Sequence, residues 1–287
     1  MINLNKFNLL IAFKSNLIKK LIPGLFVITA ITVVFCYLHL KYNIVNIHLS
    51  AALPASMGAT LGLLLVFRNN TAYERWWEAR KEIGALVNTS RNLALNLNSL
   101  LHMHNEEKDT ISNLLIAFVH SLKSHLRSGV QMDEIKHLIE AEDVEMVSNA
   151  GNKPNIIMNC IGQRIEVLYE QKYITDTQEC LLLSQVNGLV DILGKCERIK
   201  NTPMPIAYTF LLKFFIVIYV MLLPFGMLET IGWWSIPLVM ILYYLLMSIV
   251  LTAEEIEEPF GEDMNDLKMD QISANIEKNI KEIIKHD

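Results

Sequence analysis

The sequence is poor in the features that mark disulfide-rich, metal-binding and nucleic-acid-binding proteins. Its 287 residues include only four cysteines, and these form no CxxC pair and show no metal-ligand spacing. The formal net charge is −5, so no basic excess favours nucleic acid as a partner. We therefore expect no nucleic-acid binding, and reduced thiols at Cys36, Cys160, Cys180 and Cys196.

Catalytic motifs are also missing. There is no GxSxG, HExxH, P-loop or GxGxxG pattern, and the histidine pairs His102/His104 and His120/His125 have no consistent third ligand. The long apolar stretches carry no Asp or Glu in their central turns, where a proton-coupled transporter would need them. A pair of broken helices in inverted repeats is also absent. The sequence therefore predicts no enzymatic activity and favours passive flow over coupled transport.

Apolar residues, in contrast, are abundant and grouped. They make up 52% of the chain, which is more than an ordinary soluble domain carries. A helix needs roughly 17–25 mostly apolar residues to cross a bilayer, because lipid offers no partners for backbone N–H and C=O groups. Four stretches meet this requirement, namely residues 21–40, 48–67, 206–228 and 233–253.

This pattern predicts an all-α integral membrane protein with four transmembrane helices and a cytoplasmic helical domain. The periodicity of the polar middle of the chain is helical, and proline- and glycine-containing breaks interrupt it. The expected divisions are an amphipathic cytoplasmic helix at 1–20, a transmembrane hairpin at 21–67, a cytoplasmic helical domain at 68–205, a second hairpin at 206–253 and an acidic cytoplasmic segment at 254–287.

The positions of lysine and arginine predict the orientation. Lys19 and Lys20 precede the first apolar stretch, and Arg68 and Arg75 follow the second, whereas the two hairpin loops hold one lysine and none. Cytoplasmic flanks carry the basic excess, so both termini should be cytoplasmic. Lys213 lies inside the third stretch, where it should snorkel, face protein or line a pore.

The second stretch is the one that we expect to line a pore. Gly58 and Gly62 are four residues apart and would permit close approach of a neighbouring helix. Ala59, Leu63 and Phe67 repeat at the same spacing and form one apolar stripe. Around a symmetry axis, this stripe would make stacked apolar rings of the kind that gate by dewetting. From periodicity alone, ordinary packing against lipid or other helices remains open.

Three motifs occur in order along the chain. Residues 67–91 contain the sequence Arg75-Trp76-Trp77, and residues 202–208 and 254–263 lie where the chain enters the third stretch and leaves the fourth. Together they resemble the signature of the prokaryotic bestrophins, and the Arg-Trp-Trp core is shared with animal bestrophins. The resemblance covers nearly the whole chain. One departure is Ile83, where the family pattern has tryptophan.

The resemblance implies a homopentamer with a single central pore, embedded in membrane lipid and lined by the second transmembrane helix. Carried over by position, the hydrophobic neck of the family falls on Ala59, Leu63 and Phe67, the same residues as the stripe. Ala59 is smaller than the isoleucine that is common at the outer neck position. The resemblance therefore implies a wider outer ring in this chain.

Further residues acquire expected roles in the same way. A second, cytoplasmic constriction would fall near Thr177, and the neck would be supported by Arg68, Arg75, Trp76 and Trp77. These assignments follow from position within the family pattern and not from spacing or composition.

An acidic segment at residues 253–270 resembles the stretch that animal bestrophins use as a calcium clasp. The two side-chain ligand positions correspond to Asp263 and Asp266, but Met264 and Asn265 dilute the acidic run. Calcium requires six to eight oxygen ligands. Calcium could therefore bind here, although we expect no required cofactor. The alternatives are a solvated acidic helix start, or acids that enrich cations near an inner mouth.

The residues and the resemblance together thus predict a pentameric bestrophin-like ion channel in a bacterial inner membrane. It would pass small monovalent ions passively through an apolar neck. The first expectation is an anion such as chloride. A monovalent cation channel of the same architecture is the first alternative, because an apolar neck carries no charge ring that would set the ion sign. A non-conducting membrane scaffold or regulatory protein is the second alternative.

Overall fold

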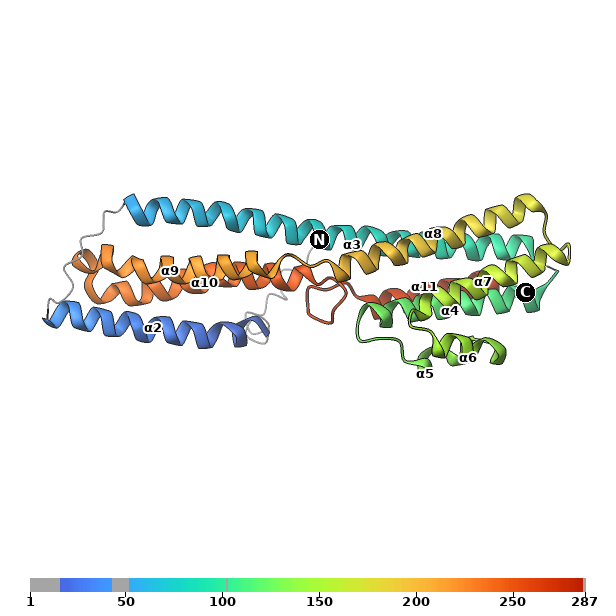
Figure 1. Cartoon of the computed structure of the whole chain (residues 1–287), viewed down its shortest axis with the longest axis horizontal. Coiled ribbons are helices and arrows are strands. Elements are labelled where there is room, and N and C mark those ends of the chain that lie inside the picture. Colours follow the sequence, from blue (N-terminus) through green and yellow to red (C-terminus); the bar gives the residue numbers. More distant parts are fainter. Residues whose placement is uncertain (1–15, 43–51, 102, 286–287) are drawn as a thin grey trace. The chain divides into compact units, whose positions relative to one another are not determined.

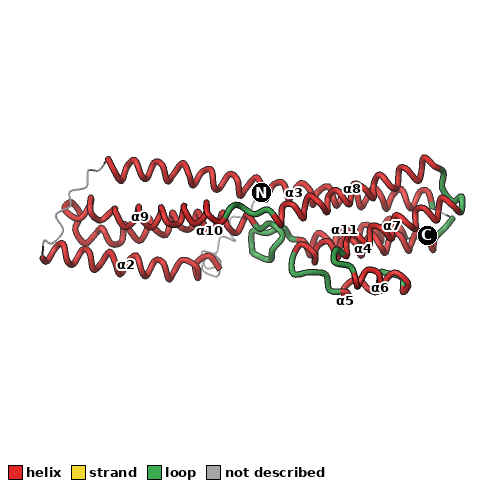
Figure 2. Tube along the Cα trace, viewed as in Figure 1, coloured by secondary structure: helices red, strands yellow, loops and turns green. Residues whose placement is uncertain are grey.

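The computed structural model describes residues 16–42, 52–101 and 103–285, and its regular elements there are helices (Figures 1 and 2). The predicted helical fold class is confirmed for these residues. The chain divides into two compact units. The first unit comprises Met1–Arg75 and Met204–Glu257, and the second comprises Trp76–Pro203 and Glu258–Asp287. The predicted amphipathic helix at 1–20 lies largely outside the described residues.

The first unit is built from long apolar helices. α10 packs against both α9 and α2 (Figure 1). The 3₁₀ turn η3 (Gly232–Trp234) joins α9 to α10, so these two helices form the predicted second hairpin. The helices of this unit are α2 (Asn16–Tyr42), the N-terminal part of α3 (Ala52–Leu100), α9 (Ile206–Ile231) and α10 (Ser235–Glu257).

Two stretches of the described chain are long and apolar enough to cross a membrane, judged by length and composition alone. They are Lys19–Tyr42 and Ile206–Glu257, and the second contains both α9 and α10. The predicted stretch at 48–67 begins outside the described residues, because α3 is described from Ala52 onward. α3 continues without a break past residue 67 to Leu100, so no loop separates the predicted hairpin from the predicted cytoplasmic domain.

One face of each helix forms the core of the first unit. Close approach of the helices depends on small residues at two points. A Cβ at Gly24 would collide with the hydroxyl of Tyr243, and a Cβ at Gly58 would lie 2.8 Å from the hydroxyl of Tyr219. At Gly62 a Cβ would meet nothing within 4 Å. The prediction that glycine permits close packing of this stretch is therefore confirmed at Gly58, and at Gly62 it stays a prediction.

The second unit surrounds a large apolar core with shorter helices. α4 is buried along most of its length and packs against α7 and α11. α11 is amphipathic and turns Ile276, Ile280 and Ile284 inward. The elements of this unit besides the C-terminal part of α3 are α4 (Asn105–Leu126), α5 (Met132–Ile135), η2 (Lys136–Leu138), α6 (Ala141–Asn149), α7 (Lys153–Glu170), α8 (Asp176–Asn201) and α11 (Met269–Ile284).

Local sequence explains where α7 and α8 begin. The side chain of Asn152 accepts the N–H of Asn155 to cap α7, and Pro154 occupies the first turn, where its missing N–H costs nothing. Thr175 and Gln178 form a capping box at the start of α8. Between these helices the chain turns through Lys172, whose φ is 59°. This tight connection makes α7 and α8 adjacent partners in the core.

Candidate functional site

The face that α3 turns away from its own unit carries the predicted neck. Leu63 and Phe67 are each 56% exposed, and Ala59 is also exposed. Leu61 and Leu65 are buried. Successive residues of a helix are about 100° apart, so the two sets lie on opposite faces. The interpretation as a stripe on one face is therefore confirmed, and within the described chain this stripe is not part of the core.

Hydroxyl groups on this part of α3 are bonded to their own helix. Ser56 donates to the carbonyl of Leu53 at 2.9 Å, and Thr60 donates to the carbonyl of Ser56 at 3.0 Å. One turn after the stripe, Thr71 donates to the carbonyl of Phe67 at 3.0 Å. These hydroxyl hydrogens are used within the helix backbone. The stripe itself, made of Ala59, Leu63 and Phe67, presents only hydrocarbon side chains.

Directly after the stripe, α3 buries a charge. The side chain of Arg68 is 1% exposed, and its Nη2 lies 2.5 Å from Oε2 of Glu257, which is 7% exposed. The other carboxylate oxygen of Glu257 accepts the backbone N–H of Met204 at 2.5 Å. Nη1 of Arg68 contacts the sulfur of Met204 at 3.0 Å. A buried pair of this kind is tolerated only when both charges are well bonded.

Arg75 joins the same cluster from two helical turns further along α3. Its Nε donates to the backbone carbonyl of Glu257 at 2.9 Å. Glu257 is the last residue of α10, where backbone carbonyls have no partner within the helix and a cation is favourable. The first unit thus brings together one residue from each of the three sequence motifs, represented by Arg68, Met204 and Glu257. Sequence reasoning missed the roles of Glu257 and Met204, although both lie inside motifs.

Trp76 and Trp77 belong to the second unit. Trp76 donates its indole N–H to the carbonyl of Asn265 at 3.2 Å, and the two indole rings stack at a centroid distance of 6.4 Å. Trp77 is 48% exposed. Trp76 therefore holds the loop that follows α10. Trp77 stacks on Trp76, and much of the Trp77 ring remains on the surface.

Thr177 is exposed in the first turn of α8 and is also in the second unit. It lines a surface cavity of about 560 Å³ with Tyr169 and Asp176, among others. The hydrogen bond from the Tyr169 hydroxyl to the Asp176 carboxylate raises the pKa of Tyr169, because the carboxylate favours the protonated phenol. The residues that line this cavity all belong to the second unit.

The acidic loop of residues 258–268 adopts a tight turn. Asp266 is 8% exposed, and its Oδ2 accepts the backbone N–H of Asp263 at 2.7 Å. A Cβ at Gly261 would lie 2.5 Å from this oxygen, so a larger residue there would displace the Asp266 carboxylate. Asp263 itself is exposed. One oxygen of the predicted Asp263/Asp266 pair is therefore engaged within the loop.

Basic side chains at the C-terminal end of α4 bind the residues on either side of this turn: Lys123 lies in the helix, and Arg127 directly follows it. Arg127 donates to the carbonyl of Phe260 at 3.2 Å and to the carboxylate of Asp270 at 2.7 Å, and Lys123 lies 3.3 Å from Asp270. The hydrogen bond from Arg127 lowers the pKa of Asp270, with a smaller contribution from Lys123. The described residues contain no group of three or more His, Cys, Asp or Glu side chains that could hold a metal ion. Calcium binding at Asp263 and Asp266 stays a prediction.

Lys213 of α9 has a partner within the first unit. Its Nζ lies 2.6 Å from the carboxylate of Glu254 on α10, and its side chain is 38% exposed. The structure thus shows Lys213 in contact with protein, and a role in lining a pore stays a prediction. The ion pair satisfies a charge that would be costly beside lipid.

Long apolar helices with an exposed stripe, together with a charged helical unit, define a helical membrane protein. The chain belongs to the bacterial and fungal bestrophins: the family model described as "Bacterial/Fungal Bestrophin protein" matches residues 3–282. The family predicted from the three motifs is therefore confirmed.

Relatives and solved structures extend this finding. A voltage-dependent anion channel-forming protein from Nostoc sp. is 40% identical over 227 residues, which cover 78% of this chain and 74% of that protein. A voltage-dependent anion channel-forming protein from Escherichia coli is 30% identical over 259 residues, covering 90% of this chain and 83% of that protein. The crystal structure of a bacterial bestrophin homologue from Klebsiella pneumoniae has a TM-score of 0.86 at 28% identity, covering 93% of this chain and 99% of that one.

Proposed function

We propose that this protein is a bestrophin-like ion channel that passes small monovalent ions passively, with anions such as chloride as the conducted species. The relatives from Nostoc sp. and Escherichia coli are both described as voltage-dependent anion channel-forming proteins. The observation that carries the proposal for this chain is the apolar stripe of α3, which points away from the core of its own unit at Leu63 and Phe67.

The stripe acquires a function if several copies surround one axis. We propose a homopentamer in the inner membrane, with four transmembrane helices per copy and both termini in the cytoplasm. Each copy would contribute Ala59, Leu63 and Phe67 to the neck. The exposure of these residues in a single chain supports this assembly, because large apolar side chains on a helix need either lipid or another protein surface.

The neck would act by controlling hydration. Rings of Leu63 and Phe67 offer no hydrogen bonds to an ion, so a narrow ring excludes water and stops conduction, and a wider one admits a hydrated ion. The smaller Ala59 would leave the outer ring wider. Arg68 and Arg75 would hold the helix behind the neck, as their bonds to Glu257 suggest. Trp76 and Trp77 would support the next turns of α3, and Thr177 would form a second constriction in the cytoplasmic part.

We propose that conduction requires no bound cofactor. The bond of Asp266 to the backbone of Asp263 and the contacts of Arg127 with Phe260 and Asp270 support a loop held by internal bonds. Addition of millimolar calcium should therefore change neither the current nor the thermal unfolding temperature. A calcium-dependent current that disappears in Asp263→Ala would contradict this part of the proposal.

A cation channel of the same architecture is the alternative that one observation favours. The acidic stretch at residues 253–270 contains several exposed carboxylates, which would enrich cations near an inner mouth. A non-conducting scaffold is the second alternative. It would have the same fold and lack a current.

The test is the reversal potential of the purified protein in a planar bilayer under a salt gradient, with sodium and chloride replaced in turn by large impermeant ions. A potential near the chloride equilibrium value supports the anion channel, and one near the sodium value establishes the cation channel. Chemical crosslinking should give a ladder that ends at five copies. No current from intact pentamers would favour the scaffold.

A further inference from the structure

We infer that Glu257 is a positioning residue that fixes the rotation of α3 about its own axis, and with it the direction in which Phe67 points. This inference rests on the proposed function, because Phe67 is a neck residue only in the proposed channel. Glu257 follows α3 by more than 150 residues of sequence, so its role is a product of tertiary structure.

The first argument is that Glu257 bonds α3 at two points. Arg68 binds its carboxylate and Arg75 binds its backbone carbonyl. These arginines are seven residues apart, which is close to two full turns, so both project from the same face of α3. A single attachment would leave a helix free to turn or slide about that point. Two attachments on one face to one residue restrict both motions.

The second argument is the position of Arg68 relative to the neck. Phe67 precedes Arg68 and lies about 100° from it around the helix. A rotation that carried Phe67 out of the neck would therefore also move Arg68 away from Glu257. Arg68 is almost fully buried, and within the described residues Glu257 is the acid that pairs with it. Separating the pair would leave a buried charge without compensation, which is strongly unfavourable.

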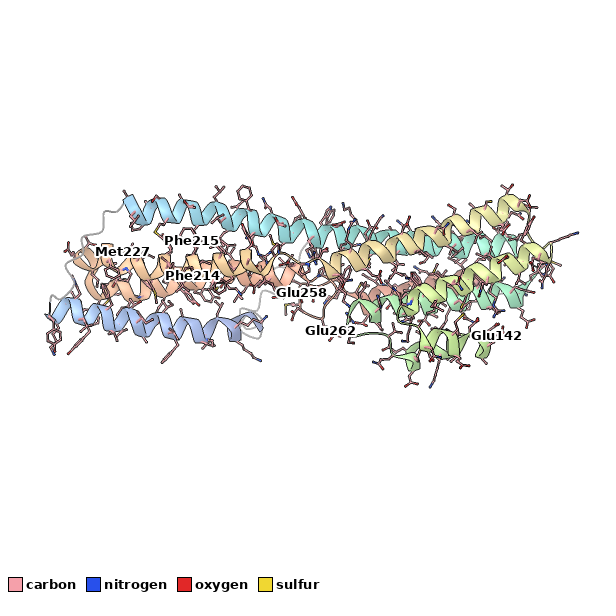
Figure 3. All side chains as sticks on the ribbon, in the orientation of Figure 1. Glu142, Phe214, Phe215, Met227, Glu258 and Glu262 are labelled. Atoms are coloured by element: carbon pink, nitrogen blue, oxygen red, sulfur yellow. The ribbon has the colours of Figure 1, made fainter. Side chains whose placement is uncertain are left out.

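The third argument is that Glu257 is itself held in place. Its second carboxylate oxygen accepts the N–H of Met204, in the segment that leads into α9. Glu257 thus connects α3 to both helices of the second hairpin. The adjacent Glu258 offers a comparison, since it is exposed and begins the loop after α10 (Figure 3).

The experiment measures how accessible a cysteine at position 67 is to a reagent in water, which reports the direction in which that side chain points. The full-length protein carries Cys180→Ser and Phe67→Cys, is reconstituted in vesicles, and is reacted with a water-soluble maleimide. We expect Glu257→Gln to change the labelling rate by about tenfold or more, because loss of one partner of a buried pair disfavours the original geometry at least that strongly. Glu258→Gln, the same chemical change at an exposed neighbour, should leave the rate close to that of the parent.

A double variant separates positioning from simple charge compensation. Arg68→Met with Glu257→Gln removes both charges, so it should restore assembly and thermal stability if Glu257→Gln alone impairs them. The labelling rate should stay altered, since no ion pair holds the helix. A rate that returns to the parent value in the double variant, or equal rates in Glu257→Gln and Glu258→Gln, would overturn the inference.

Current recordings keep this inference distinct from the proposed function. In the chain with native Phe67, Glu257→Gln should replace the main conductance level by one or more different levels, and Glu258→Gln should retain it. Absence of current from the unmodified protein would count against the channel. The labelling comparison would then still decide the role of Glu257, since it does not depend on conduction.

Discussion

The two units of the chain use the same secondary structure against different surroundings. The first unit exposes large apolar side chains along its helices, including Phe26 and Val34. Phe214, labelled in Figure 3, is another. The second unit buries most of its apolar side chains in one core and carries ion pairs on its surface, as between Arg164 and Glu142. Helix formation alone therefore does not decide whether a helix suits water or lipid. The distribution of apolar residues around each helix decides it.

Charges follow the same division. In the first unit, the buried Arg68 pairs with Glu257 and the half-buried Lys213 pairs with Glu254, in each case across helices. In the second unit, a pair such as Lys195–Glu82 has its lysine 47% exposed. Water screens a pair such as Lys195–Glu82 far more than the nearly fully buried pair Arg68–Glu257. The two units should therefore respond very differently to loss of a single charge.

The largest expected effect is the loss of Arg68. Arg68→Ala should destabilise the protein by about 3–5 kcal/mol, because it leaves the Glu257 carboxylate buried without its cation. Lys195→Ala removes an exposed pair and should cost less than about 1 kcal/mol. Thermal unfolding of the purified protein in detergent measures both. Equal destabilisation by the two substitutions would remove the contrast between the units.

The next effect concerns conduction through the first unit. Phe67→Ala should raise the single-channel conductance severalfold, since it removes the bulkiest ring of the proposed neck. Leu61→Ala, on the buried face of the same helix, should reduce stability and leave the conductance of assembled channels unchanged. Unchanged current in Phe67→Ala would count heavily against the assignment of the neck.

A smaller effect should appear in the second unit on acidification. The pKa of Asp270 is lowered from 3.8 by Arg127, so its contribution to stability is present above pH 4 and is lost as the pH falls through the lowered value. Because Asp270 is 66% exposed, the contribution is modest. Hydrogen exchange of α11 at pH 7 and pH 3 should show the loss. In Asp270→Asn this pH-dependent part should be absent.

The smallest effect concerns thiol chemistry in the second unit. Burial raises the pKa of Cys160 to about 11 and that of Cys196 to about 12, so neither should form a thiolate near pH 8. Cys180 is exposed on α8. Maleimide should modify Cys180 in the native protein and reach Cys160 and Cys196 only after unfolding. Rapid native labelling of Cys196 would show that the core opens readily.

Periodicity and motifs allowed much of the fold to be predicted. The apolar stretches coincide with α2, α9 and α10, and the family pattern pointed to Arg68 and Arg75. Periodicity also placed Ala59, Leu63 and Phe67 on one face. These predictions succeeded because helix formation, amphipathicity and motif spacing are local properties that a short stretch of sequence carries by itself.

Other features depended on which residues meet across the chain. The sequence left Lys213 with three environments, and only packing of α9 against α10 brought it to Glu254. It also placed Glu257 inside a motif without indicating its partner, Arg68.

The sequence by itself thus determined that this protein is helical, apolar enough for a membrane and a member of the bestrophin family. Only the tertiary structure decided which face of α3 is left exposed and which acid compensates Arg68. The physical reason is the distance along the chain. Arg68 and Glu257 are separated by 189 residues, and their pairing depends on how whole helices pack and not on any pattern within one of them.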